Sequence, residues 1–104
     1  MDKYIMETNI VTKQKDEVKI KKPKNYKVVM YNDDYTTMEF VINILVNVFN
    51  KKLVEAEKIM IDVHKRGKGV AGIYSYDIAI TKVSTAMSMA KEDGFPFKLT
   101  VEEA

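Results

Sequence analysis

The pattern of apolar and polar residues divides the chain near residue 25. Residues 1–25 are polar and rich in lysine, and they show no sustained period of 2 or 3.6 residues. From Tyr26 onward, short apolar segments with helix or strand periodicity alternate with turn residues. A polar, lysine-rich segment such as 1–25 buries too little apolar surface to fold. We therefore expect a flexible N-terminal extension over 1–25 and one core domain over 26–104.

Three helices are expected in the core domain, because apolar residues recur there at helical spacing. The first begins with Thr36 three residues before Glu39, the spacing of a capping box. The second ends at Gly67, which suits a left-handed C-terminal cap, and the third begins after Ser75, a good N-cap residue. The apolar residues at helical spacing run from Phe40 to Phe49, from Leu53 to Val63 and from Ala79 to Ala90.

Three strands are expected between and beside these helices. Tyr26–Tyr31 is β-branched and aromatic, Val70–Tyr74 is short and apolar, and the stretch from Phe97 to Val101 alternates apolar with polar residues. The predicted order is β-α-α-β-α-β. The fold class is therefore α+β, with a small three-stranded antiparallel sheet whose single covered face packs on three helices.

Composition restricts the compartment and the chemistry. A chain of 104 residues with 46% apolar content is large enough for one domain that folds alone. It contains no cysteine, so disulfides and thiolate nucleophiles are excluded, and we expect a cytoplasmic protein. No apolar run approaches the roughly 18 residues of a membrane span, so no membrane segment is expected.

The charge distribution argues against nucleic-acid binding. The net charge of +2 comes from the first 25 residues, which hold seven Lys against four acids, a balance of +3. Residues 26–104 hold ten Lys or Arg against eleven acids, a balance of −1. A nucleic-acid module usually carries a Lys/Arg stripe on its folded surface, so no nucleic-acid partner is expected.

Two polar features in the core domain are candidates for chemistry: the turn Asn32-Asp33-Asp34 and the single histidine, His64. Each also has a purely structural interpretation, the first as a strand-to-helix turn and the second as a favourable partner for a helix C-terminus. A metal site would need His64 and these carboxylates, without a recognisable ligand spacing. We expect no metal and no cofactor, whereas an acid–base enzyme using Asp34 and His64 remains an alternative.

Two runs of sequence resemble the signature segments of the ClpS family. They are YKVVMYNDDYTTMEFV over 26–41 and VHKRGKG over 63–69. The element order, the spacing of the two runs, Thr81-Lys82-Val83 and the closing strand also match, so the resemblance spans 26–104. It implies a fold like the C-terminal domain of ribosomal protein L7/L12.

The resemblance also implies a function, that of a non-enzymatic adaptor. Such an adaptor recognises the free N-terminal Phe, Tyr, Trp or Leu of N-degron substrates and delivers them to the N-terminal domain of a Clp unfoldase, ClpA or ClpC, and we expect it to be a monomer. A generic peptide-binding or protein-interaction module of the same fold, without N-terminal specificity, is the alternative.

The resemblance nominates three groups of residues. An α-amino group is mostly protonated at neutral pH and needs acceptors; those nominated are Asn32, Asp33, Asp34 and His64. The nominated hydrophobic pocket consists of Thr36, Met38, Val41, Met60, Val63 and Phe97. The nominated contacts with the unfoldase are Asp77 and Lys82.

Three positions depart from the family pattern. Thr37 stands where many members have Pro, which removes a fixed φ at the helix start. Phe97 stands where Leu is common, so its bulk narrows the expected pocket and leaves the preference among Phe, Tyr, Trp and Leu open. Ile80 stands where a relative carries an acid, which leaves the identity of the unfoldase open.

Overall fold

The structure is a computed structural model that describes residues 23–104. Most of the extension expected over 1–25 therefore lies outside the described residues. Its last residues lie beside the end of the chain, because the Lys24 ammonium is 3.2 Å from a Glu103 carboxylate oxygen and the Ala104 amide donates to the Asn25 carbonyl at 2.9 Å.

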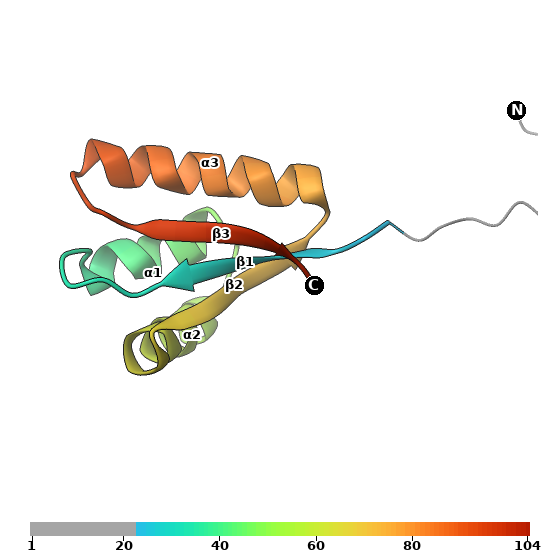
Figure 1. Ribbon diagram of the computed structural model, residues 1–104. Helices are drawn as coiled ribbons and strands as arrows, with labels where there is room; N and C mark the ends of the chain where they lie inside the picture. Colours follow the sequence, from blue (N-terminus) through green and yellow to red (C-terminus); the bar gives the residue numbers. More distant parts are fainter. Residues whose placement is uncertain (1–22) are drawn as a thin grey trace, which may run out of the picture.

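The described residues form three strands and three helices in the predicted β-α-α-β-α-β order (Figure 1). Their bounds are β1 Tyr26–Tyr31, α1 Met38–Asn47, α2 Leu53–Arg66, β2 Lys68–Tyr74, α3 Tyr76–Glu92 and β3 Lys98–Glu103.

Two strand boundaries differ from the expected ones. β2 begins at Lys68 rather than Val70, and β3 begins one residue after Phe97 and extends to Glu103. Both shifts arise because Tyr31 of β1 pairs with Lys68 on one side and Lys98 on the other. Backbone hydrogen bonding across the sheet sets the strand ends, so polar residues outside the apolar runs are included.

The sheet has the order β2-β1-β3, and both pairs are antiparallel. Val28 and Met30 of the central strand are fully buried in the core cluster, while Val29 between them points to the opposite face of the sheet. A bulge at Val28/Val29 leaves Ala71 as the extra residue of β2, since Val28 pairs with Gly72 and Val29 with Val70.

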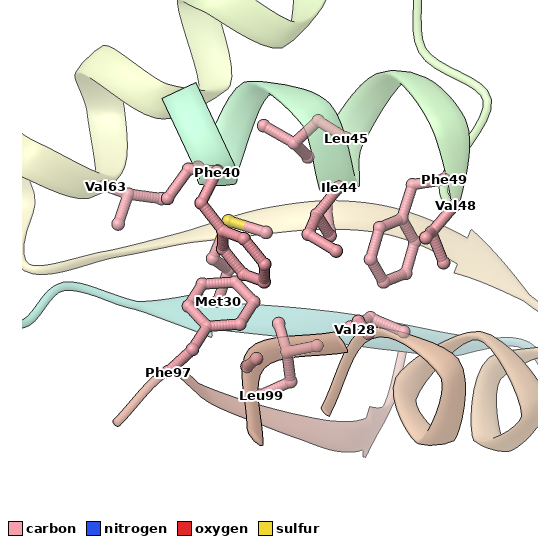
Figure 2. Close-up of a cluster of buried hydrophobic side chains, with 14 of the residues drawn as sticks. Val28, Met30, Phe40, Ile44, Leu45, Val48, Phe49, Val63, Phe97 and Leu99 are labelled. Carbon is pink, nitrogen blue, oxygen red and sulfur yellow. The ribbon is translucent and has the colours of Figure 1, made fainter. Parts of the chain in front are cut away.

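The helices pack on the face of the sheet that carries Val28 and Met30. α3 lies on the β3 side, α2 lies on the β2 side, and α1 lies between them (Figure 1). Figure 2 shows side chains of α1, among them Phe40 and Ile44, meeting the sheet residues in one continuous core. The Phe40 ring also meets Phe97 edge to face, with centroids 5.5 Å apart, so the segment before β3 closes one end of the core.

The cap of α1 differs from the expected capping box. The N-cap residue is Thr37, whose hydroxyl accepts the Phe40 amide at 3.1 Å. Thr36 is not the cap because its own hydroxyl is hydrogen-bonded to Asp33. Gly67 caps α2 in the left-handed conformation, with φ 89°, as expected. Ser75 occupies the N-cap position of α3 without a capping hydrogen bond from its side chain.

Candidate functional site

Asp33 organises the turn between β1 and α1. Its Oδ1 accepts the backbone amides of Tyr35 at 2.8 Å and Thr36 at 2.7 Å, and its Oδ2 accepts the Thr36 hydroxyl at 2.7 Å. Partial burial alone would raise the pKa of Asp33, but the hydrogen bonds from Thr36 and Tyr35 outweigh it and hold that pKa below its ordinary value. Asp33 is therefore an ionised residue that shapes the turn.

A hydrogen bond joins the two signature runs. The backbone amide of Asn32 donates to the Gly67 carbonyl at 2.9 Å, and the backbone amide of Gly67 donates to the Val63 carbonyl at 2.9 Å. Asn32 is thus fixed beside the C-terminal end of α2, where His64 occupies the last turn. The side chains of Asn32, Asp34 and His64 are exposed, whereas the fourth nominated polar residue, Asp33, uses its carboxylate to hold the turn.

The six residues nominated for a pocket differ in exposure. Val41, Val63 and Phe97 belong to the core, with 8%, 4% and 3% of their surfaces exposed. Thr36 and Met60 are half-buried, and Met38 is 54% exposed at the start of α1. Figure 2 shows that Val63 and Phe97 reach the same end of the core, beside Phe40. Buried and exposed members thus come from the turn, from α1, from α2 and from the segment before β3.

Two surface depressions border this set. Met38 lines a depression of about 450 Å³ along α1, together with Ile42, Val46 and Leu53. Phe97 lines a separate one of about 620 Å³ beside α3.

The two residues nominated for unfoldase docking have different surroundings. Asp77 is exposed in the first turn of α3, next to the exposed apolar side chains of Tyr76 and Ile78. Lys82 is half-buried, and its ammonium donates to the Val48 carbonyl at 2.6 Å and to the Asn50 side-chain oxygen at 2.7 Å. Sequence reasoning missed these bonds because the partners lie more than thirty residues away along the chain.

Within residues 23–104, the His, Asp and Glu side chains form no cluster of three or more that could hold a metal ion. In the same range, no helix has the length and apolar character needed to cross a bilayer.

Comparison with known proteins gives consistent matches over the core domain. The family model described as ATP-dependent Clp protease adaptor protein ClpS matches residues 21–100. The ATP-dependent Clp protease adapter protein ClpS of Clostridium acetobutylicum is 58% identical over 89 residues, which cover 86% of this chain and 88% of that protein. The protein of the same name from Acetivibrio thermocellus is 48% identical over 97 residues, covering 93% of this chain and 98% of that protein.

A solved structure is also similar. Agrobacterium tumefaciens ClpS2, solved bound to L-phenylalaninamide, has a TM-score of 0.76 and 40% identity, and the match covers 80% of this chain and all of that one. Fold and sequence together place the protein among the adaptors of the ATP-dependent Clp protease. The chain belongs to the ClpS family.

Proposed function

We propose that this adaptor recognises the free N-terminal residue of N-degron substrates, preferring Phe, Tyr, Trp and Leu, and delivers them to a Clp AAA+ unfoldase-protease as a cytoplasmic monomer. The observation that carries the proposal is the hydrogen bond from the backbone amide of Asn32 to the Gly67 carbonyl. This bond sets the Asn32-Asp33-Asp34 turn beside the last turn of α2, which carries His64. The Agrobacterium relative bound to L-phenylalaninamide adds support, since that compound has a free α-amino group and a phenyl side chain.

The polar surface supplies the acceptors that an ammonium group needs. The Asn32 side chain accepts through its amide oxygen, neutral His64 accepts through one ring nitrogen, and Asp34 adds negative charge. Asp33 supports them indirectly, because it fixes the turn from which Asn32 and Asp34 project. An acetylated terminus has no ammonium, so it would leave these acceptors unpaired and bind weakly.

The neighbouring apolar residues supply the pocket for the first side chain. Val41, Val63 and Phe97 form its wall within the core, and Met38 stands exposed at its entrance. Burial of a Phe or Leu side chain contributes roughly 1.5–3 kcal/mol, and each hydrogen bond to the ammonium contributes about 1.5–3 kcal/mol. After association costs, the dissociation constant is on the order of micromolar, which suits a cargo that must be released.

Delivery is proposed to use α3. Asp77, exposed in its first turn beside Tyr76 and Ile78, is the proposed contact with the N-terminal domain of ClpA or ClpC, together with Lys82 on the same helix. The exposed apolar residues around Asp77 give this end of α3 the mixed character that is typical of interface patches.

Fluorescence anisotropy tests the proposal with a labelled peptide that begins with Phe, its N-acetylated form and a peptide that begins with Val. We expect about micromolar affinity for the free Phe peptide, and loss of at least about tenfold on acetylation or in Asn32→Ala and His64→Ala. Lys58→Ala, on the exposed part of α2, is the matched control and should bind as wild type.

Equal binding of all three peptides would contradict the proposal and would favour a generic interaction module. Turnover of a peptide panel that is lost in His64→Ala would instead indicate the acid–base enzyme.

A further inference from the structure

The face of the sheet opposite the three helices carries a cluster of cations. A depression of about 310 Å³ lies there, and its apolar base includes Val29 and Val70. The charged residues that line the depression are Lys27, Arg66, Lys68 and Glu102. Three cations and one carboxylate thus surround the apolar base, whereas residues 26–104 as a whole carry a net charge of −1. We call this feature the basic depression.

Arg66 and Lys68 are the cations of the basic depression that can bind a ligand most readily. Lys27 already has a partner, since its ammonium lies 4.0 Å from a Glu102 carboxylate oxygen. Within residues 23–104, no carboxylate oxygen lies within 4.0 Å of the charged group of Arg66 or Lys68. Arg66 also suits the negative end of the α2 dipole, and its five N–H donors allow it to bind a carboxylate as well. Both side chains are exposed.

The basic depression adjoins the proposed site for the substrate ammonium. Gly67 connects the two, because its carbonyl accepts the backbone amide of Asn32 at 2.9 Å and its chain neighbours Arg66 and Lys68 line the depression. The sheet gives the same relationship, since Tyr31, which precedes Asn32, pairs with Lys68. A chain held by its N-terminus at Asn32 therefore reaches these two cations within a few residues.

The length and charge of the basic depression indicate which ligand fits it. Its lining residues extend from Lys68, level with Tyr31, to Lys27 at the other end of β1. That length is about 13 Å at the rise of a strand, which about four extended residues span. The N-terminal extension of this chain is a poor ligand, because residues 1–25 carry a charge of +3 and the cations would repel it. An acidic segment has the complementary charge.

We propose that the basic depression binds acidic residues at about positions 3–6 of the substrate, an inference that rests on the proposed function. The substrate ammonium is held beside Asn32, the chain continues past Gly67, and its carboxylates pair with Arg66 and Lys68. The preferred substrate class is thus an N-degron whose first residue is followed by an acidic segment. The hydrophobic pocket selects the first residue, and Arg66 and Lys68 select the segment behind it.

The test uses fluorescence anisotropy with the full chain and three labelled peptides. All begin with Phe and share a neutral background, and positions 3–5 are Glu, Gln or Lys. We expect the Glu peptide to bind at least about threefold more tightly than the Gln peptide, as for exposed ion pairs, and the Lys peptide to bind more weakly. The advantage of Glu should shrink as salt rises from about 0.05 M to about 0.5 M. An advantage that salt leaves unchanged would overturn the inference.

The double variant Arg66→Gln/Lys68→Gln locates the effect. It should bind the Glu and Gln peptides equally, with the wild-type affinity for the Gln peptide. The matched control is Lys58→Gln/Lys91→Gln, which removes the same charge from exposed positions outside the basic depression and should keep the preference for Glu. Loss of the preference in both double variants would overturn the inference, because net charge and not the basic depression would then be the cause.

A second variant carries the test if Arg66→Gln/Lys68→Gln does not fold. Glu102→Gln removes the carboxylate beside Lys27, so it should increase the preference for the Glu peptide, and an unchanged or smaller preference would overturn the inference. An N-acetylated Glu peptide that binds as tightly as the free form would overturn it too, because the acidic segment would then bind independently of the N-terminus.

The failure of this inference is distinguishable from failure of the proposed function. Wild-type protein that binds the free Glu and Gln peptides equally, and loses both on acetylation, would overturn the inference alone. Wild-type protein that binds none of the Phe peptides would overturn the proposed function and the inference together.

Discussion

Gly69 lies so close to Val63 that a β-carbon added at Gly69 would stand 3.0 Å from Val63 Cγ2. The beginning of β2 thus packs directly against Val63, the α2 residue that belongs both to the core and to the proposed pocket. This contact makes Gly69 a determinant of the pocket although its side chain is only a hydrogen atom.

Gly69→Ala should displace Val63 and narrow the pocket. We expect a loss of about 1–3 kcal/mol in the free energy of unfolding, as for overpacking of a core, and a greater loss of affinity for Trp than for Leu peptides. Urea unfolding and anisotropy titrations measure the two effects. In a Val63→Ala background, where the opposing methyl group is absent, Gly69→Ala should lower the free energy of unfolding only slightly. An equal loss of stability in the wild-type and Val63→Ala backgrounds would contradict the contact.

Gly67→Ala tests the left-handed cap that places Asn32 beside α2. With φ 89° at this position, a β-carbon costs roughly 1–2 kcal/mol, and we expect that loss in urea unfolding together with weaker peptide binding. Asn tolerates the left-handed conformation better than Ala, so Gly67→Asn should lose less stability and less peptide affinity than Gly67→Ala. Equal losses for Ala and Asn would show that the backbone conformation is not the cause.

Asp33→Ala removes the carboxylate that receives three hydrogen bonds from Tyr35 and Thr36. We expect the free energy of unfolding at pH 7 to fall by about 1 kcal/mol, as for loss of a cap. Because the folded-state pKa of Asp33 lies below the ordinary 3.8, its stabilisation is complete above about pH 5 and disappears as the pH falls through the folded-state pKa.

The difference in stability between wild type and Asp33→Ala should therefore shrink between pH 5 and pH 2.5 in urea unfolding. A difference that stays constant down to pH 2.5 would mean that the Asp33 charge is not involved.

Thr37→Ala removes the hydroxyl that accepts the Phe40 amide, and we expect a loss of about 1 kcal/mol in thermal or urea unfolding. Thr37→Pro also loses the hydroxyl, but the observed φ of −74° at Thr37 lies within the range that proline imposes. The fixed φ lowers the entropy of the unfolded chain, so the Thr37→Pro variant should be more stable than the Thr37→Ala variant. The opposite order would contradict the assignment of Thr37 as the cap.

Met38→Ala should broaden the specificity of the proposed site. Met38 is exposed at the start of α1, the proposed entrance of the pocket, where it would meet the branched β-carbon of an N-terminal Val or Ile. Removal of most of its side chain should improve binding of the Val peptide relative to the Phe peptide, measured as a ratio of dissociation constants. Ile42→Ala, one turn further along α1, is the control and should leave the ratio unchanged.

The arrangement of elements could be predicted from the sequence because its signals are local. Gly67 indicated its own cap, and the helical spacing of Phe40, Ile44 and Leu45 indicated a buried face. The capping box was assigned one residue too early, because Thr36 and Thr37 carry the same hydroxyl and only the side chain of Asp33 distinguishes them. The composition of the proposed site came from resemblance to a family, because its members lie far apart in the sequence and no local pattern joins them.

The sequence by itself determined the α+β class, the order of the six elements and the turn at Asn32-Asp33-Asp34, since each depends on residues that are neighbours in the chain. Only the tertiary structure decided where the strands end, that Asn32 is bonded to Gly67, and that Lys82 caps α1. These features join residues 32 and 67, or 48 and 82, which meet only when the sheet and helices close on one core. Their physical basis is the requirement that backbone carbonyl and amide groups find partners after burial, and local sequence does not say which distant residue will supply them.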